Sequence, residues 1–599
     1  MISEDKQIFR SANYNPLDHY FASRLLQLAD SESLELYLAG GLTSHQASKG
    51  HVCLDLEKFC SQKLEWQDSQ DQLQSMTLPG LEEWKQKLQN ESVVGLPEEN
   101  TPLIIDSHRG QTLLYLNRYW HYEQNLASSI LDRAQQPVIL DEILLQEGLQ
   151  RLFPPQNQEK NLQRSAVEIA LQHQFCIISG GPGTGKTSVV IKILSLLIQQ
   201  AKGADIHIAL TAPTGKAAAR LKESVVNGKQ ELLNSNHLSR EEGQRIPESA
   251  STIHRLLGVQ KNSVYFKNNH EHPLSLDCLV VDEASMVDLA LMSKLLDALP
   301  AKTRLILLGD KNQLSSVEAG SVLGDLCEEF EGKSASLEQC IIHLQKSHRF
   351  DDTKGVGLLS REINQNSDQR AWEILENRDR GVTRNPLPVP SALKERLKKE
   401  VLEKYRSYLV TVHGKDAAAA FKAFKSFMVL SATRRGLFGS NNINRVIENL
   451  LREENLIPQE TVWFPGRPIM ITRNDYNLNL YNGDIGIILT DPQDNRLRTF
   501  FESDGGFRRI APARLPEHET VFAMTIHKSQ GSEFDEILLI LPEPGSEPFG
   551  RELIYTGVTR SRNAVNIWTE EKIFKSTVQK RCERSSGLKD KLRLEKLTF

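Results

Sequence analysis

A glycine-rich loop between an apolar run and a helical segment constrains this chain more than any other feature. The loop fits the pattern G-x-x-x-x-G-K-[ST] and consists of Gly180, Gly181, Pro182, Gly183, Thr184, Gly185, Lys186 and Thr187. Residues 175–179 before it read as a buried strand, and residues 188–194 after it read as a helix. Glycines let backbone N–H groups converge on an anion, and the helix N-terminus adds a favourable dipole. The sequence therefore predicts an α/β fold with a phosphate loop for ATP or GTP.

Polar residues in this loop and after a later strand have the chemistry for nucleotide hydrolysis. Lys186 would reach the β- and γ-phosphates, and Thr187 would hold Mg²⁺. The apolar run 279–281 ends in Asp282 and Glu283. Asp282 is placed to hold Mg²⁺, and Glu283 is placed to orient and deprotonate the attacking water. Two acids after a strand are common by themselves, so this assignment depends on the phosphate loop before them.

Short apolar runs alternate with helical segments from about residue 160 to residue 343. The runs at 206–210, 278–281 and 304–308 predict strands of a parallel sheet with helices on both faces. Residues 225–250 are polar and charged, and they read as an insertion. From about 462 to 515, β-rich runs surround an Asn-Gly-Asp turn, which predicts a small β-barrel inserted in a second α/β domain.

These patterns divide the chain into predicted domains. Residues 1–110 carry no chemical motif and predict a helical N-terminal domain. Its acidic stretch at 54–100 suits docking to a protein partner better than binding to phosphate. Residues 111–343 would form the first α/β domain, and residues 344–599 would form the second. A solvated helical domain without a partner is the alternative for the N-terminal part.

Bulk composition is that of an ordinary globular protein. Hydrophobic residues make up 39% and charged residues 25% of the 599 positions, and the formal net charge is −5. No apolar stretch approaches the ~18 residues that span a bilayer, and the first residues lack the pattern of a secretory signal. We therefore expect a cytoplasmic protein without a membrane partner. Any contact with nucleic acid must come from basic groups gathered in one place.

Two further turns have residues that suit phosphate. Thr214, Gly215 and Lys216 follow the run 206–210 and would grip a nucleic-acid phosphate. Gln313 follows the run 304–308 and would sense the γ-phosphate. Each turn by itself is equally consistent with an ordinary connection between a strand and a helix.

The order of these segments resembles superfamily 1 DNA helicases, and specifically the RecD family. Besides the phosphate loop, the matching segments lie at residues 163–166, 212–221, 251–258, 281–288, 309–320, 345–350, 524–534 and 555–562. Residues 466–471 with 482–486 narrow the resemblance to the RecD group, and residues 50–54 are also similar. The resemblance implies two RecA-like P-loop NTPase domains, with a small SH3-like β-barrel inserted in the second.

The resemblance also implies roles for single residues. Gln163 would read the adenine edge, and Arg349 and Arg560 would act as arginine fingers on the γ-phosphate. Because charge develops on the transferred phosphoryl group, a cation that arrives on domain closure would stabilise the transition state. The predicted catalytic residues are Lys186, Glu283, Gln313, Arg349 and Arg560. The predicted contacts to single-stranded DNA are Thr214, Gly215, Lys216, His254, Thr525, His527 and Gln530.

One position departs from the family pattern. The family usually has a tyrosine before the motif arginine, where its ring stacks on adenine, and this chain has His348 before Arg349. Imidazole stacks with less area than a phenol ring. We therefore expect ATP binding that is weaker or mildly dependent on pH.

The function that the resemblance implies is an ATP-dependent 5′→3′ single-stranded DNA translocase and DNA helicase that uses ATP and Mg²⁺. RecD proteins act with RecB and RecC in an exonuclease–helicase. This implies a heterotrimer with RecB-like and RecC-like subunits that processes duplex ends at double-strand breaks for homologous recombination. The sequence has no recognisable nuclease pattern, so exonuclease activity is expected only from a partner subunit.

Three alternatives stay open. A stand-alone RecD-like helicase usually has a longer N-terminal extension than this chain. A superfamily 1 RNA helicase would have a similar motor, because backbone contacts do not read the sugar decisively. A structural subunit with an inactive ATPase is disfavoured by the intact Lys186, Asp282 and Arg560.

Overall fold

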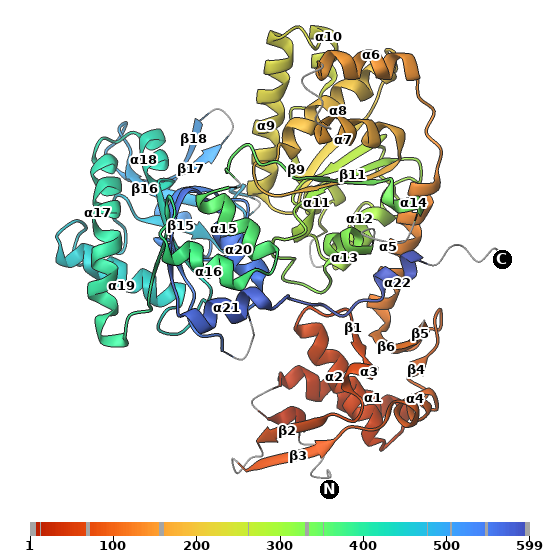
Figure 1. Ribbon diagram of the computed structural model, residues 1–599. Coiled ribbons are helices and arrows are strands. Elements are labelled where there is room, and N and C mark those ends of the chain that lie inside the picture. The colour runs from red at the N-terminus through yellow and green to blue at the C-terminus, as the bar shows by residue number, and fades with distance from the viewer. Residues whose placement is uncertain are drawn as a thin grey trace.

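The chain forms an N-terminal region, a first α/β domain above it and a second α/β domain to the left (Figure 1). The computed structural model describes residues 8–593, except 12–13, 68–71, 109, 155–160, 261–262, 330–334, 352, 476, 504–505 and 546–548. Among the described residues, no helix combines the length and apolar character that crossing a membrane requires.

The N-terminal region mixes helices and strands. Its helices are α1 (Pro16–Ala29), α2 (Leu34–Ser48), α3 (Leu56–Phe59) and α4 (Leu81–Gln89). Its strands are β1 (Cys53–Asp55), β2 (Lys63–Gln67), β3 (Leu73–Thr77), β4 (Val94–Gly95), β5 (Leu103–His108) and β6 (Gln111–Leu116). The strands β2 and β3 pair as a hairpin, and the other strands form a sheet of order β1-β6-β5-β4.

Two predictions for this region were wrong. The domain is not purely helical, and strands of two to six residues are too short to give a clear alternating pattern in the sequence. The boundary at residue 110 falls before β6, which pairs with both β1 and β5 and therefore completes the N-terminal sheet.

The first α/β domain is built on a parallel sheet, as predicted. Its strands are β7 (Phe175–Gly180), β8 (Ile208–Ala212), β9 (Ser251–Thr252), β10 (Cys278–Val281), β11 (Arg304–Gly309) and β12 (Ile341–Leu344). Their order is β12-β7-β11-β10-β8-β9, and neighbouring strands run parallel. Ile177 of β7 belongs to one buried core, whereas Cys176 and Ile178 belong to another. Successive side chains of a strand point to opposite faces, so helices cover both faces of this sheet.

The helices of this domain lie before and between these strands in the sequence. They are α5 (Asn117–Gln135), α6 (Glu142–Leu152), α7 (Leu162–Gln172), α8 (Lys186–Gln200), α9 (Gly215–Asn234), α10 (Arg240–Arg245), α11 (Ile253–Leu257), η2 (Ala284–Met286), α12 (Leu289–Asp297), α13 (Val322–Glu329) and α14 (Ala335–Glu338). The insertion predicted at 225–250 was wrong in part, because residues 225–234 continue α9. Val225 and Leu232 are buried on one side of that helix, and the polar residues between them hid this apolar side in the sequence.

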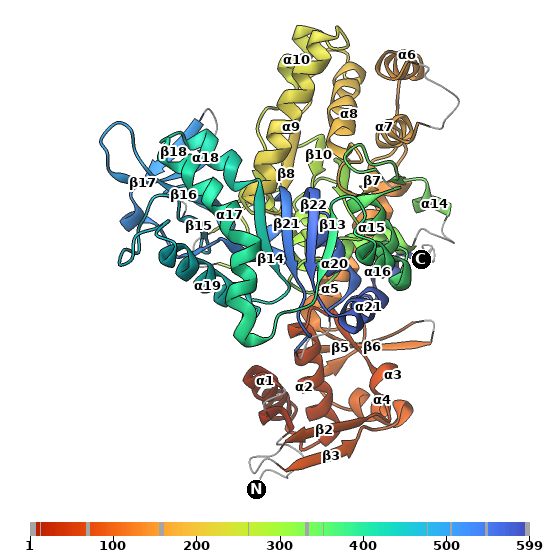
Figure 2. The same cartoon turned by 60° about the vertical axis from the view of Figure 1, so that its left-hand side comes forward.

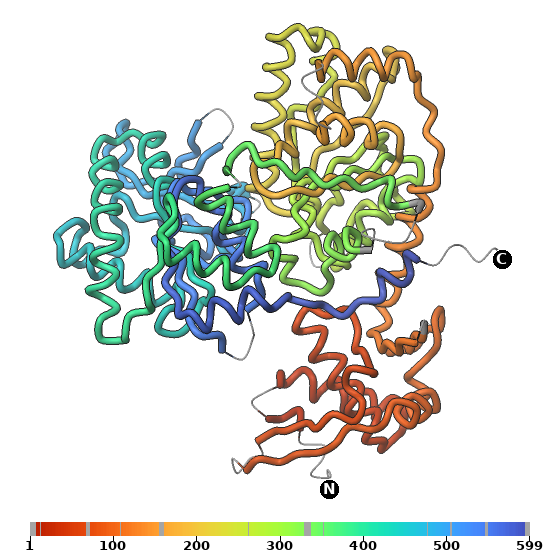
Figure 3. The backbone as a smooth tube through the Cα atoms, in the orientation of Figure 1, coloured from red at the N-terminus to blue at the C-terminus, as the bar shows by residue number. Residues whose placement is uncertain are grey.

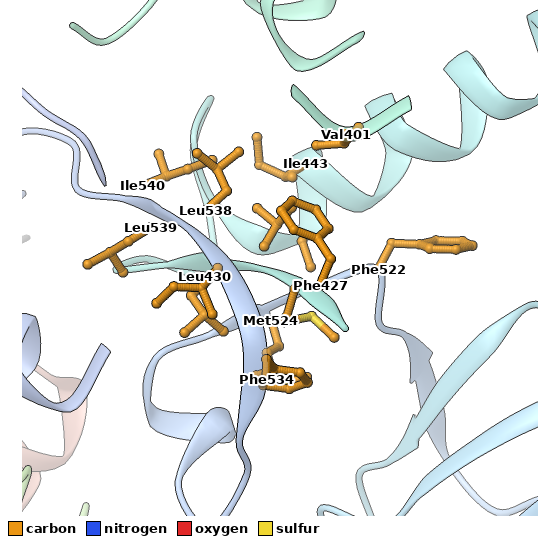
Figure 4. Packing of buried hydrophobic residues seen from close by; sticks show 14 of the residues in the cluster. Val401, Phe427, Leu430, Ile443, Phe522, Met524, Phe534, Leu538, Leu539 and Ile540 are labelled. Carbon is orange, nitrogen blue, oxygen red and sulfur yellow. The ribbon is translucent and has the colours of Figure 1, made fainter. Parts of the chain in front are cut away.

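The second α/β domain has its own parallel sheet (Figure 2). Its strands are β13 (Val382–Asn385), β14 (Phe427–Ser431), β20 (Ala523–Thr525), β21 (Phe534–Ile540) and β22 (Ser561–Trp568), in the order β13-β22-β21-β14-β20. Its helices are α15 (Gly355–Asn364), α16 (Asp368–Glu376), η3 (Pro390–Ala392), α17 (Leu393–His413), α18 (Ala417–Phe424), α19 (Ser440–Glu453), η5 (His527–Ser529), α20 (Arg551–Val558) and α21 (Glu571–Gln579). Figure 4 shows part of the core, where Leu538 of the sheet lies near Ile443 of α19, and Leu430 points to the other face of the sheet.

An antiparallel sheet is inserted between α19 and β20. It contains β15 (Pro468–Ile471), β16 (Ile485–Thr490), β17 (Leu497–Ser503), β18 (Gly506–Ile510) and β19 (His518–Thr520), with η4 (Pro512–Arg514) before β19. The pairing order is β18-β17-β16-β15-β19. The predicted insertion at 462–515 stops short of β19, which pairs with β15.

The C-terminal segment leaves the second α/β domain after α21 and returns to the other parts of the chain (Figure 3). Its last helix, α22 (Leu588–Arg593), packs against α5 and α13. The backbone N–H of Val52 donates to the carbonyl of Ser585, 2.8 Å away. The predicted second domain at 344–599 is therefore too long, because its end belongs structurally to the first α/β domain and the N-terminal region.

Candidate nucleotide-hydrolysis site

Most residues predicted to contact the nucleotide, and three predicted to contact DNA, lie on loops and first helical turns at one edge of the first sheet. Residues 181–185 follow β7, residues 214–216 begin the helix after β8, and residues 282–283 follow β10. Residues 310–313 follow β11, and residues 345–349 follow β12. Because parallel strands end at the same edge of a sheet, segments far apart in the sequence meet there.

The phosphate loop has the backbone that its glycines predict. Gly183 has φ +78° and Gly185 has φ +85°, which is left-handed backbone. A Cβ on Gly183 would lie 2.4 Å from Cβ of Arg349, so a side chain has no room there. Nζ of Lys186 donates to the carbonyls of Gly180 and Gly181 at 2.6 and 3.1 Å. The first turn of α8 has no side-chain cap, so its N–H groups suit an anion such as phosphate.

Gln163 and His348 meet beside this loop. Nε2 of Gln163 donates to the carbonyl of Thr184 at 3.3 Å and lies 3.4 Å from Nε2 of His348. The backbone N–H of His348 donates to the carbonyl of Gly183 at 2.8 Å. The two residues predicted to contact adenine therefore lie together against the phosphate loop.

The acidic pair follows β10 in a strained turn. Glu283 has φ +50°, which is unusual for a residue with a side chain. Its backbone N–H donates to Oδ1 of Asp282 at 2.8 Å. Burial and the neighbouring charge of Glu283 raise the pKa of Asp282 to about 6. The half-buried carboxylate of Asp282 and the Thr187 hydroxyl on the first turn of α8 are oxygen ligands of the kind that Mg²⁺ prefers.

Arg560 of the second α/β domain reaches Gln313 of the first. Its Nη2 donates to Oε1 of Gln313 at 3.0 Å, and its Nε donates to the carbonyl of Thr556 at 3.1 Å. Both Arg560 and Gln313 are buried. Burial lowers the pKa of Arg560 from its ordinary value, with Glu283 opposing that change. The predicted arginine finger and the predicted phosphate sensor are therefore direct partners across the two domains.

Arg349 pairs with a carboxylate that it shares with other arginines. Its Nη2 lies 2.7 Å from Oε1 of Glu533, and Nη1 of Arg220 lies 3.4 Å from the same oxygen. Nη2 of Arg562 lies 3.0 Å from Oε2 of Glu533. Burial opposes the ionisation of Glu533, but the arginines outweigh it and lower its pKa. Three basic residues from both domains thus gather around one carboxylate at the junction of the domains.

Some of the predicted DNA contacts also lie at this junction. Nζ of Lys216 contacts Oγ of Ser532 in the second domain. Burial, with the nearby charges of Arg220 and Lys425, lowers the pKa of Lys216 to about 7. Nε2 of Gln530 donates to the carbonyl of Leu314 at 3.0 Å.

The other residues predicted to contact DNA have different surroundings. Oγ1 of Thr214 accepts from the N–H of Ala217 and caps α9, and Cβ on Gly215 would lie 3.5 Å from Tyr481 of the inserted sheet. The ring of His254 meets the edge of Phe266, with the ring centres 5.7 Å apart. Thr525 is buried, and His527, two residues further on, is exposed. These residues keep their predicted role as a hypothesis.

Sequence reasoning assigned no role to four residues that complete this site. Asp310 and Tyr555 form a hydrogen bond of 2.9 Å between the domains, and Glu533 and Arg220 form the ion pair described above. All four lie inside segments that match the family pattern. The available signal was their position inside these segments, which does not by itself identify a partner.

Family models match separate parts of the chain. The RecBCD enzyme subunit RecD N-terminal domain matches residues 12–115. An AAA domain matches residues 163–319, and a UvrD-like helicase C-terminal domain matches residues 520–568.

Curated relatives match most of the chain. A RecBCD enzyme subunit RecD from Haemophilus influenzae is 37% identical over 519 residues, which cover 79% of this chain and 79% of that protein. A RecBCD enzyme subunit RecD from Mycolicibacterium smegmatis is 35% identical and covers 96% of this chain and 97% of that protein. An ATP-dependent RecD2 DNA helicase from Deinococcus radiodurans is 29% identical and covers 78% of this chain but 57% of that protein.

A P-loop domain that meets a second parallel-sheet domain through a buried arginine defines a motor ATPase of the helicase type. The matches to AAA and UvrD-like helicase domains agree with that class. The chain belongs to the RecD family. The predicted family and the predicted class of enzyme, an ATP-dependent DNA helicase, are confirmed.

Proposed function

We propose that this chain is an ATP-driven 5′→3′ motor on single-stranded DNA, and that it unwinds DNA within a RecBCD-type complex. The observation that carries the proposal is the direct contact of Arg560 in the second α/β domain with Gln313 in the first. A change at the phosphate loop can therefore alter the contact between the domains, which is what a translocating motor requires. The direction of movement rests on family membership.

Each residue of the site has a part in the proposed cycle. Lys186 and the N–H groups of α8 bind the phosphates of ATP, and Gln163 and His348 hold the base. Asp282 and Thr187 would hold Mg²⁺, which would supply positive charge to the phosphates. Glu283 takes a proton from the attacking water, and Arg349 and Arg560 stabilise the charge that develops on the γ-phosphate.

The position of the residues predicted to contact DNA indicates how ATP hydrolysis would be coupled to movement along DNA. Lys216 and Gln530 make contacts between the two domains, so opening or closing the junction would change their grip on a phosphate backbone. Arg349 would exchange Glu533 for the γ-phosphate when the domains close. Hydrolysis would reverse both changes, and one cycle would move the chain along the strand.

Two assays test the motor. We expect single-stranded DNA to stimulate ATP hydrolysis, and we expect strand displacement on a partial duplex with a 5′ tail but not with a 3′ tail. Absence of DNA-stimulated hydrolysis in the purified chain and in its complex would overturn the proposal. Equal stimulation of ATP hydrolysis by RNA would instead favour the alternative that the chain is an RNA helicase.

The partners in the proposal are RecB-like and RecC-like subunits, with the N-terminal region as the docking surface. The match of residues 12–115 to the RecD N-terminal domain supports this. Exonuclease activity would then belong to a partner. The native mass of what co-purifies with the chain tests the assembly: two larger companions in equal amounts support it, and a lone chain of 67.7 kDa contradicts it.

Two finer features belong to the same proposal. The inserted sheet would close into an SH3-like barrel around the buried side chains of Ile469, Ile488 and Phe501. The protein would act in the bacterial cytoplasm, where duplex ends of the chromosome arise. A crystal structure of the complex and a fluorescent fusion in cells test these two statements.

A further inference from the structure

One carboxylate oxygen joins the two α/β domains beside the phosphate loop. Oδ2 of Asp310 accepts a hydrogen bond from the hydroxyl of Tyr555 at 2.9 Å and another from Nε2 of Gln313 at 3.0 Å. Tyr555 lies on α20 of the second domain, whereas Asp310 and Gln313 lie on the loop after β11 of the first. The other carboxylate oxygen accepts from the N–H of Asn312 at 3.0 Å, so the carboxylate is held on both sides.

This arrangement fixes the orientation of the Gln313 amide. Because Nε2 is committed to Asp310, Oε1 faces Nη2 of Arg560 at 3.0 Å. A reversed amide would present an N–H group to the guanidinium, which has only donors. The hydroxyl of Tyr555 therefore acts on the predicted sensor through Asp310.

The same helix holds the sensor loop at a second point. Oγ1 of Thr556 accepts from the N–H of Leu314 at 2.9 Å. Nε of Arg560 donates to the carbonyl of Thr556 at 3.1 Å, so the arginine is tied to the residue next to Tyr555. Tyr555, Asp310, Gln313 and Arg560 thus form a closed set of contacts between the two domains.

Burial makes these contacts interdependent. Tyr555 and Asp310 expose 4% and 2% of their surfaces, and Gln313 and Arg560 expose 7% and 3%. A polar group left without its partner at such a site cannot turn to water instead. Loss of one hydroxyl would therefore disturb the whole set, although no apolar packing is removed.

The hydroxyl of Tyr555 also lies against the phosphate loop. A Cβ on Gly181 would be 3.0 Å from this oxygen, closer than a side chain normally approaches. The hydroxyl thus sits between the start of the phosphate loop and the sensor loop. A side chain from the second domain reaches this place only while the two domains are in contact.

We propose that Tyr555 is a positioning residue for ATP hydrolysis, which sets Gln313 and Arg560 through Asp310 when the two domains meet. The inference rests on the proposed function, because it assigns hydrolysis to this junction. Tyr555 does not act on ATP itself: its hydroxyl keeps the sensor amide and the arginine in the orientation that hydrolysis needs.

The test replaces Tyr555→Phe in the full chain, which keeps the ring and removes only the hydroxyl. We expect kcat of DNA-stimulated ATP hydrolysis to fall about 10-fold, with KM for ATP changed less than about 2-fold. The matched control is Tyr408→Phe, because the Tyr408 hydroxyl is also buried and donates to the carbonyl of Gly466 at 3.0 Å within the second domain. The control should keep the parental kcat.

A second variant tests the route through Asp310. Asp310→Asn should reduce kcat, and the double variant with Tyr555→Phe should lose less than the product of the two single losses. A parental kcat in Tyr555→Phe, an equal loss in Tyr408→Phe, or multiplicative losses in the double variant would each overturn the inference. If the parent itself shows no DNA-stimulated hydrolysis, the proposed function fails first, and the two failures are thereby distinguished.

Discussion

The second α/β domain meets the rest of the chain in two places that are built differently. At the junction with the phosphate loop, the contacts are single hydrogen bonds and ion pairs, such as Arg560 to Gln313 and Gln530 to the carbonyl of Leu314. Within the described residues, Leu314 is the one side chain of the first domain in the buried apolar cluster of the second. When the two domains separate at this junction, few apolar atoms become exposed and the polar groups can bond to water, so opening the whole junction costs less than losing one partner while it is closed.

The other meeting place is the C-terminal helix α22. Leu588 and Leu592 are buried in the apolar cluster of the first domain. Nζ of Lys591 lies 3.3 Å from Glu123 and 3.8 Å from Asp106, at ion-pair distances. It also lies over the rings of Tyr115 and Trp120, at 5.1 and 4.8 Å from their centres.

The segment before this helix is also held in place, by hydrogen bonds to the first α/β domain and to the N-terminal region. Nη1 of Arg584 donates to the carbonyls of Glu318 and Gly320 at 2.6 and 2.9 Å. Nδ1 of His51 accepts from the N–H of Ser585 at 2.9 Å, which ties the segment to the N-terminal region. The junction is held mainly by polar contacts, which suit repeated opening, whereas residues 584–592, the C-terminal anchor, add buried apolar side chains to their polar contacts. The second domain would therefore move about a fixed attachment rather than separate from its neighbours.

The largest effect is expected on the junction side, from Lys186→Gln. Nζ of Lys186 lies against the carbonyls of the phosphate loop, where it would meet the β- and γ-phosphates. Loss of this cation should reduce ATP hydrolysis by about 10²–10³-fold or more without unfolding the chain. Steady-state ATPase rates and a melting curve measure both properties. Equal ATPase rates in variant and parent would reject the site, whereas a large fall in melting temperature would show that the junction, too, is structural.

The next largest effect is expected from Lys591→Met, which removes the cation of the anchor. The variant leaves the buried carboxylates of Glu123 and Asp106 without their cation, at an expected cost of about 3 kcal/mol of stability. Urea unfolding of the full chain measures it. The matched control is Lys404→Met, whose partner Glu536 is 42% exposed and whose loss should change stability little. Similar losses in both variants would mean that the anchor is no stronger than a surface ion pair.

A smaller effect is expected on the pH dependence of stability, through a carboxyl group beside the anchor. Burial raises the pKa of Asp325 to about 6, with Lys589 opposing this and Glu123 adding to it. Because the folded pKa lies above the ordinary value near 3.8, Asp325 holds its proton longer in the folded chain, and its contribution to stability falls as pH rises from about 4 to about 6. Two units correspond to about 3 kcal/mol at most. Asp325→Asn should therefore raise the melting temperature at pH 7 and flatten the slope between pH 4 and pH 6; an unchanged slope would contradict the assignment.

The two meeting places also differ in how far the sequence predicts them. The phosphate loop, the acids after β10 and the parallel sheets follow from local patterns, since a strand, a glycine loop and a helix are adjacent in the chain. Tyr555 and Asp310 are 245 positions apart, and no local pattern pairs them. Lys591 lies in a short charged helix with no motif, so its buried partners could come only from the folded chain. The strands of the N-terminal region were missed for another reason: they are too short to give a clear alternating pattern, although β2 pairs with β3 and β5 pairs with β6, each the next strand along the chain.

The smallest expected effect concerns the binding of adenine at the junction. His348 lies beside Gln163 and against the phosphate loop, in the place where the family usually has a stacking tyrosine. His348→Tyr would enlarge the stacking area on adenine and should lower Kd for ATP about 3-fold. Titration with a fluorescent ATP analogue measures this. His207→Tyr is the control, because His207 is exposed and lies just before β8, at the other edge of the sheet. An unchanged Kd in His348→Tyr would mean that the ring at this position does not contact the base, and the part of the junction that binds adenine would have to be sought beside Gln163 alone.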